Sequence, residues 1–178
     1  MKILRAHNYT GVERVRSELE RLPPQWLSAI DWVPWIVLPD DLDPVWTGLV
    51  REDMACSEGR TNSNVGGWCY VRRDHPDVAH FPHIFLQEWS WDAAVHEAAH
   101  AIEATWHAPV YELFRPKRAL FPYMASSPWE YFACALDAFC SNEETMRFGY
   151  HRDDLAKADP EIFAYLDWML QEGAHARA

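Results

Sequence analysis

Hydrophobic and polar residues alternate along the first half of the chain in patterns that predict one helix and then three short strands. Between residues 10 and 22, valines and leucines recur at helical spacing, and two prolines follow. Stretches rich in β-branched and aromatic residues predict strands within residues 32–39, 68–73 and 83–87. We expect the second and third of these strands to pair antiparallel.

Helical patterns dominate the second half. An alanine-rich segment predicts a helix over residues 91–106, with Ser90 as its N-cap. Residues 107–127 contain three prolines and are predicted to be irregular. Ser127 followed by proline predicts the start of another helix, and a last helix is expected near residues 160–171. This order of elements predicts an α+β fold with a small mixed or antiparallel sheet and a C-terminal helical part.

The length and composition indicate one compact domain. The chain has 178 residues, 49% of them hydrophobic, and its ten tryptophans can bury a large apolar area. We expect a single domain over residues 1–178, with an N-terminal helix and strand region (1–66), a catalytic core (67–140) and C-terminal helices (141–178).

Charge and hydropathy exclude several classes of partner. The formal net charge of −11 argues against nucleic acid and against an anionic membrane surface. No stretch approaches the roughly 20 apolar residues of a membrane span, and the N-terminus has no apolar run of signal-peptide length. These features predict a cytoplasmic protein that leaves the cell, if at all, without a signal.

The four widely spaced cysteines of the chain are expected to be free thiols.

The predicted helix over 91–106 carries a candidate metal site. His96 and His100 are four residues apart and therefore lie on one helix face, where their imidazoles can hold one Zn²⁺. Glu97 is one step round the helix, where its carboxylate can take a proton from water activated by the metal. This is the H-E-x-x-H arrangement of zinc metallopeptidases. The alternative is that both histidines are partly buried and hydrogen-bonded without a metal.

A catalytic zinc needs a third protein ligand. The metzincin extension of the motif fails, because Glu103 and Trp106 stand where that pattern has glycine and histidine, and His107 is one residue late. A glutamate further along the chain is the other option, and the candidates are Glu112, Glu130, Glu143 and Glu144. Glu130 is the best of them, because it lies in the first turn of a predicted helix with an apolar face, whereas Glu143 and Glu144 resemble the acidic start of a further helix.

The motif and the segment around Glu130 together resemble a known group. "HEAAH" at 96–100, followed by "YMASSPWEYFACAL" at 123–136, is similar to the gluzincin peptidases of the anthrax lethal factor and Pro-Pro endopeptidase type. The resemblance covers about residues 67–140 and implies a zincin-like fold. It also implies that Glu130 is the third zinc ligand and that Tyr123 stabilises the oxyanion.

One departure from the pattern concerns the residues behind the zinc ligands. The resembling peptidases carry an acidic residue four positions after the ligand glutamate, where it can orient a histidine, but this chain has Cys134 there. Asp137, seven residues after Glu130, and Glu103, three residues after His100, are the alternative candidates for that role. Either can equally be a surface charge.

Peptidases of this kind commonly bind an extended substrate along an edge strand of the sheet. Trp68 and Tyr70 lie in one strand that can supply this edge, and residues 83–86 are the alternative. Gly66 and Gly67 are expected to give the backbone freedom beside it.

These patterns predict a zinc-dependent metalloendopeptidase acting on a peptide or protein. Two alternatives stay open, namely an inactive zincin-fold module with a binding or regulatory role, and a zinc hydrolase of small amides or cell-wall peptides. A toxin-like effector or a phage-encoded component is also compatible with the short chain.

Overall fold

The computed structural model describes residues 3–5, 9–39, 66–70 and 83–175, which form an α+β fold with a small mixed sheet and a majority of helices. The strands of the described part are β1 (Ile3–Arg5), β2 (Trp35–Leu38), β3 (Gly67–Tyr70) and β4 (His83–Gln87). The α-helices there are α1 (Tyr9–Leu19), α2 (Pro24–Ala29), α3 (Ala94–Trp106), α4 (Val110–Leu113), α5 (Pro128–Phe139), α6 (Arg152–Ala158) and α7 (Pro160–His175). Short 3₁₀ helices are η2 (Glu88–Ala93), η3 (Pro116–Arg118) and η4 (Met124–Ser126).

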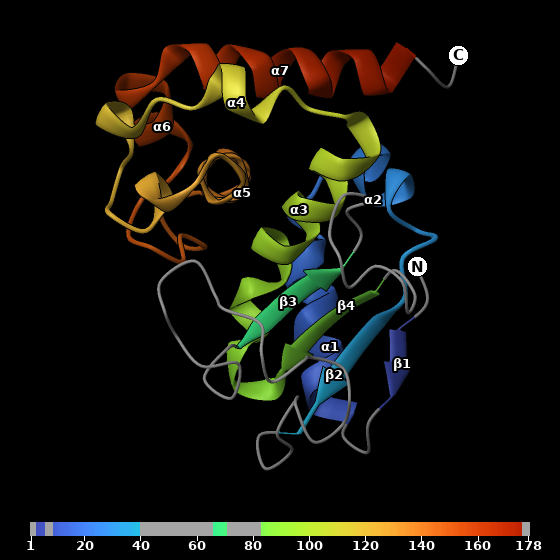
Figure 1. The fold of residues 1–178 in the computed structure, drawn as a ribbon. Coiled ribbons are helices and arrows are strands. Elements are labelled where there is room, and N and C mark those ends of the chain that lie inside the picture. The colour runs from blue at the N-terminus through green and yellow to red at the C-terminus, as the bar shows by residue number, and fades with distance from the viewer. Residues whose placement is uncertain (1–2, 6–8, 40–65, 71–82, 176–178) are drawn as a thin grey trace.

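The sheet has the strand order β1-β2-β4-β3 (Figure 1). β1 and β4 both pair with β2 in parallel, whereas β3 pairs with β4 antiparallel. The predicted antiparallel pairing of the second and third strands is therefore confirmed. β4 is interior, with all five residues buried, and β3 forms an edge of the described sheet.

Two helices cover one face of the sheet. α1 and α3 contact each other, and α3 also contacts β3 and β4. Alternation along the strands sends Trp35 and Val37 of β2, and Ile84 and Leu86 of β4, into the core that these helices share. The core therefore lies between the sheet and α3. Because one face of α3 packs on the sheet, its remaining faces are available for contacts with other helices.

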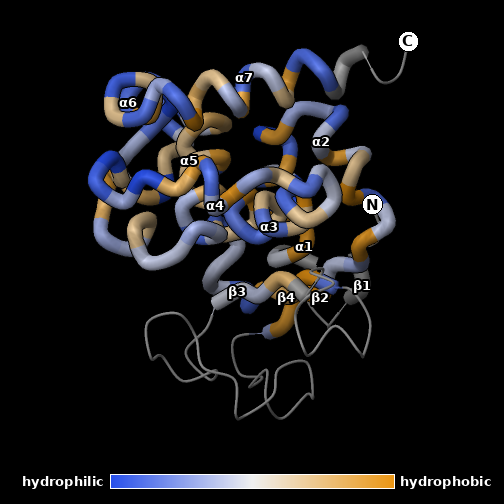
Figure 2. Tube along the Cα trace, turned by 45° about the horizontal axis from the view of Figure 1, so that its top comes forward, coloured by the Kyte–Doolittle hydropathy of each residue, from blue (hydrophilic) through white to orange (hydrophobic). Residues whose placement is uncertain are grey.

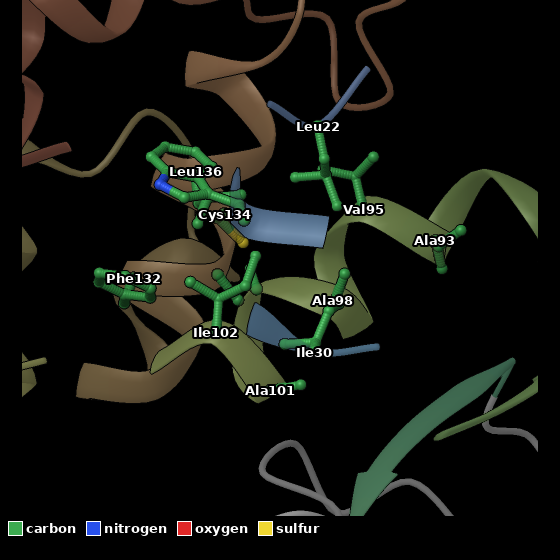
Figure 3. Close-up of a cluster of buried hydrophobic side chains, with 14 of the residues drawn as sticks. Leu22, Ile30, Ala93, Val95, Ala98, Ala101, Ile102, Phe132, Cys134 and Leu136 are labelled. Atoms are coloured by element: carbon green, nitrogen blue, oxygen red, sulfur yellow. The ribbon is translucent and has the colours of Figure 1, made fainter. Parts of the chain in front are cut away.

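α5 runs through the middle of the helical half of the molecule, where every residue from Tyr131 to Phe139 is buried. Figure 3 shows side chains of α3 meeting side chains of α5 in a common apolar cluster, among them Ala98, Ile102, Phe132 and Leu136. α7 crosses the top of Figure 1 and alternates hydrophobic and hydrophilic residues along its length (Figure 2). Ile162, Leu166 and Met169 form its buried face.

The starts of the two central helices differ from each other. Ser127 caps α5 as predicted, because its hydroxyl accepts a hydrogen bond from the backbone N–H of Glu130 at 3.1 Å and Pro128 takes the first helical turn. The prediction that Ser90 caps α3 is wrong. Ser90 lies inside η2 with a non-helical backbone, and α3 begins at Ala94 after Ala93, which makes no side-chain cap.

Several short elements were not predicted from the sequence. These are β1, α2, α6, and the single turns α4, η3 and η4 within the segment expected to be irregular. The expected helix start at Glu143 and Glu144 is also wrong, because these residues lie in a turn and the next helix begins at Arg152. The sequence also predicts a turn at residues 40–44 and a loop at residues 51–67. The turn lies outside the described residues, as does nearly all of the loop.

Two other expectations from composition can be compared with the structure. Cys69, Cys134 and Cys140 are free thiols, as expected, while Cys56 lies outside the described residues. Within the described part of the chain, every helix is too short or too polar to cross a membrane.

Candidate metal centre

α3 presents His96 and His100 on one face, toward α5. Their rings are 5.0 Å apart between centroids and nearly perpendicular, as expected for residues one helical turn apart. His96 is buried, with 3% of its surface exposed. His107, the alternative ligand in the metzincin pattern, is exposed and adopts the left-handed conformation that ends α3. The prediction that His96 and His100 lie side by side on one helix face is therefore confirmed.

α5 brings Glu130 to the same place. The Ser127 cap fixes Glu130 in the first turn of α5, and α5 packs against α3. Glu130 Oε2 lies 3.0 Å from Nε2 of His96 and 3.8 Å from Nε2 of His100. The other glutamates considered as third ligands are exposed, Glu112 in α4 and Glu143 and Glu144 in the turn after α5. Among the four candidates, Glu130 is thus the one that contacts both histidines.

The donor atoms of this cluster fit a divalent cation. Glu130 Oε2 is buried and has no partner with hydrogen-bond geometry, although two imidazole nitrogens lie close to it. A buried carboxylate oxygen without a hydrogen bond is costly unless something else compensates it. Two imidazole nitrogens and one carboxylate oxygen are also a ligand set that zinc accepts in catalytic sites.

The electrostatics of the cluster favour a positive charge between these groups. Burial alone raises the pKa of Glu130, but His96, His100 and Tyr123 together lower it to about 2. Burial alone lowers the pKa of His96, whereas Cys134 and Glu130 raise it well above its usual value. The carboxylate is therefore held ionised, and the surroundings of His96 attract a positive charge, which a metal ion can supply in place of a proton.

Glu97 lies beside the cluster and is buried, with 7% of its surface exposed. Burial is the main cause that raises its pKa to about 7, and the nearby Glu130 carboxylate raises it further. His96 and Arg147 partly offset these effects. A carboxylate with a pKa near neutrality is suited to accept and return a proton.

Tyr123 also lies within the cluster. It immediately precedes η4, its ring is 6.0 Å from the ring of His96, and its hydroxyl interacts with the Glu130 carboxylate. Burial and the neighbouring carboxylates raise the pKa of Tyr123, which therefore keeps its proton and acts as a donor. The structure thus brings together all five residues predicted as ligands or catalytic groups, namely His96, Glu97, His100, Tyr123 and Glu130.

The edge strand β3 reaches the cluster at Gly67. A Cβ atom on Gly67 would lie 2.9 Å from both Cγ and Oε1 of Glu97, and 2.7 Å from Cδ2 of Leu86. Gly67 does not have a positive φ, so the reason for glycine here is close approach rather than backbone freedom, which corrects the expectation from sequence.

We expect Gly67→Ala to displace the Glu97 carboxylate while the histidines keep their places. A misplacement of about 1 Å can cost up to about 100-fold in rate. If the protein is the hydrolase predicted from the sequence, its rate should therefore fall by up to this factor while its metal content stays unchanged. Equal rates for the variant and the wild type would mean that Glu97 does not need this space.

The other predicted substrate-binding residues are less directly related to the cluster. Alternation along β3 places Trp68 on the face opposite to Gly67, half-buried. The backbone of Tyr70 pairs with His83, but its side chain lies outside what the structure describes. The alternative edge at residues 83–86 is wrong, because β4 is flanked by β2 and β3.

The two acidic residues expected behind the ligands have other contacts. Asp137 is buried and forms an ion pair at 2.7 Å with Arg21, which also contacts Glu18 and Ser141. Burial raises the pKa of Asp137, and Arg21 and, after it, His96 lower it, so Asp137 also interacts with the ligand histidine as expected from the sequence. Asp137 therefore ties the segment after α1 to α5. Glu103 is also buried and lies near Tyr165 of α7. The burial of Tyr165 raises the pKa of its hydroxyl, and the Glu103 carboxylate raises this pKa further.

Three neighbours of the cluster were not assigned a role from the sequence. Cys134 Sγ lies 3.8 Å from Nδ1 of His96. Its position four residues after Glu130, on the same helix face, is the feature of the sequence from which this contact could have been predicted. Phe148 lies 6.3 Å from His96 between ring centroids, and Arg147 lies over the Phe148 ring and pairs with Asp92 at 3.5 Å. The sequence around Phe148 gives no comparable signal, because the turn that carries it has no regular pattern.

Donor distances also single out a second possible ligand set. Within the described residues, ligand atoms of His96, Glu130 and Cys134 all lie within 4.8 Å of one another.

Comparisons with models of known protein families and with curated protein sequences gave no match. The assignment of the cluster therefore depends on its own geometry and chemistry.

Proposed function

We propose that the protein is a zinc-dependent metalloendopeptidase in which His96, His100 and Glu130 hold the ion. The observation that carries this proposal is the approach of the buried Glu130 Oε2 to both imidazole Nε2 atoms, at 3.0 Å from His96 and 3.8 Å from His100. A zincin-like fold is part of the proposal. Two features of the element order support it. The helix that carries both histidines, α3, follows the sheet, and a later helix, α5, supplies the Glu130 carboxylate.

The residues around the ligands have separate roles in hydrolysis. Bound zinc would supply a Lewis acid that acidifies water and polarises a carbonyl group. Glu97 accepts the proton of the attacking water and returns it to the leaving amine, for which a pKa near neutrality is suitable. Tyr123 keeps its hydroxyl proton and donates a hydrogen bond to the oxyanion that develops on the substrate.

The edge strand supports a peptide as the substrate. β3 is the outer strand of the described sheet and passes directly beside Glu97 at Gly67, so an extended peptide lying along it can form backbone hydrogen bonds of the strand type. A peptide bound in this way would run past the proposed base. A small amide would make no use of this edge, and a binding module would have no use for a buried carboxylate beside its metal.

A digest of a peptide library tests this function. Zinc-loaded protein should cleave a subset of peptides, chelation should stop the cleavage, and added zinc should restore it. Glu130→Gln taken through the same purification controls for contaminating peptidases. If wild-type protein with one zinc per chain cuts no peptide, the activity assigned here is wrong and the binding-module alternative is favoured.

A further inference from the structure

The second ring nitrogen of His96 faces a sulfur atom. Cys134 Sγ lies 3.8 Å from His96 Nδ1, and Cys134 and His96 are both buried, with 1% and 3% of their surface exposed. Figure 3 shows Cys134 on α5 within the apolar cluster that includes Ile102 and Leu136. A polar ring nitrogen in such surroundings needs a partner, and the thiol is positioned to be one.

α5 contacts the His96 ring at both of its nitrogens. Glu130 and Cys134 are one helical turn apart and lie on the same face of α5. Glu130 approaches Nε2 at 3.0 Å, while Cys134 approaches Nδ1. The position of one helix therefore determines both the orientation of the ring and the surroundings of its two nitrogens.

The chemistry of imidazole assigns different tasks to the two nitrogens. A neutral imidazole that offers the lone pair of Nε2 to a metal carries its proton on Nδ1, and the group that accepts this proton fixes the tautomer. Sulfur is a weak acceptor of such a hydrogen bond. Carboxylates and backbone carbonyls usually fill this position beside ligand histidines, and they are stronger acceptors.

We propose that Cys134 is a positioning residue for His96, whose Nδ1–H donates to the thiol sulfur, so that Nε2 is presented to the metal. This inference rests on the proposed zinc site. It assigns Cys134 to the layer behind the ligands rather than to the ligand set, although His96, Glu130 and Cys134 have donor atoms within 4.8 Å of one another. The sulfur contacts Nδ1, whereas Glu130 contacts Nε2, and this division of the two nitrogens supports the choice.

Zinc affinity of cysteine variants tests the proposal by competition with a chromophoric chelator. Cys134→Ala removes the acceptor and should weaken zinc binding about 10- to 100-fold. Cys134→Ser keeps an acceptor and should recover part of this loss. Cys140→Ala, at the end of the same helix, is the matched control and should bind zinc as the wild type does. Unchanged affinity in Cys134→Ala would overturn the proposal, and unfolding of each metal-free variant identifies a general loss of stability.

Cobalt substitution gives a second readout that needs no variant. Co²⁺ bound to the wild type should show no thiolate-to-metal charge-transfer band, because the sulfur is not a ligand. A band that disappears in Cys134→Ala would overturn the proposal and would favour the ligand set that includes Cys134. If the wild type binds neither Zn²⁺ nor Co²⁺, both proposals fail. If it binds zinc through this cluster but cuts no peptide, the peptidase assignment fails and the role of Cys134 stands.

Discussion

Glu97→Gln should reduce peptide hydrolysis by about 10²- to 10⁴-fold while the protein keeps its zinc. Glutamine has nearly the same shape as glutamate but cannot accept a proton at its amide, so the base is lost and the packing against Gly67 is preserved. The ligands His96, His100 and Glu130 are untouched by this change. The measurement is kcat/KM on a cleaved library peptide, together with the zinc content of the same preparation.

Glu143→Gln is the matched control for this variant. Glu143 is exposed in the turn after α5, so the same chemical change there should leave both rate and zinc content as in the wild type. A Glu97→Gln enzyme with wild-type activity would remove Glu97 from the mechanism. Loss of zinc in Glu97→Gln would instead indicate that Glu97 is a ligand rather than the base.

Glu130→Gln should lose both zinc and hydrolysis. The change replaces a charged carboxylate by a neutral amide next to two imidazoles, and it also removes the group that attracts positive charge to His96. Residues behind the ligands already cost about 10- to 100-fold in metal affinity when they are changed. We therefore expect the zinc affinity of Glu130→Gln to fall by more than about 100-fold, as measured by competition with a chelator.

Glu112→Gln tests whether the loss of zinc affinity is specific to position 130 or follows from any replacement of a glutamate by glutamine. Glu112 was another candidate ligand from sequence, but it is exposed on α4. Its substitution should leave zinc affinity unchanged. If Glu112→Gln and Glu130→Gln weakened zinc binding equally, α5 would not be the source of the third ligand.

Features set by local chemistry could be predicted from the sequence. His96 and His100 share a face because helical geometry places residues four apart together, and the alanines between them favour helix. Ser127 and Pro128 mark the start of α5 because one side chain caps the helix and the other lacks an N–H. The start of α5 in turn determined which glutamate was expected to contact the histidines.

Features that depend on packing between distant segments could not be predicted. Asp137 pairs with Arg21, 116 residues earlier in the chain, and no local pattern indicates that partner. Gly67 was expected to provide flexibility, because the approach of β3 to α3 is visible only in three dimensions. Ser90 is a plausible cap in sequence, but η2 changes the chain direction and moves the helix start to Ala94. Short elements such as β1 and α6 contain too few residues to show a period.

Diffraction data collected at the zinc absorption edge from crystals of the zinc-loaded protein would test the metal site most directly. We predict one anomalous peak about 2.0–2.2 Å from His96 Nε2, His100 Nε2 and a carboxylate oxygen of Glu130, with Cys134 remaining on the Nδ1 side of His96. A peak bound elsewhere, or the absence of any peak between α3 and α5 at saturating zinc, would contradict the account.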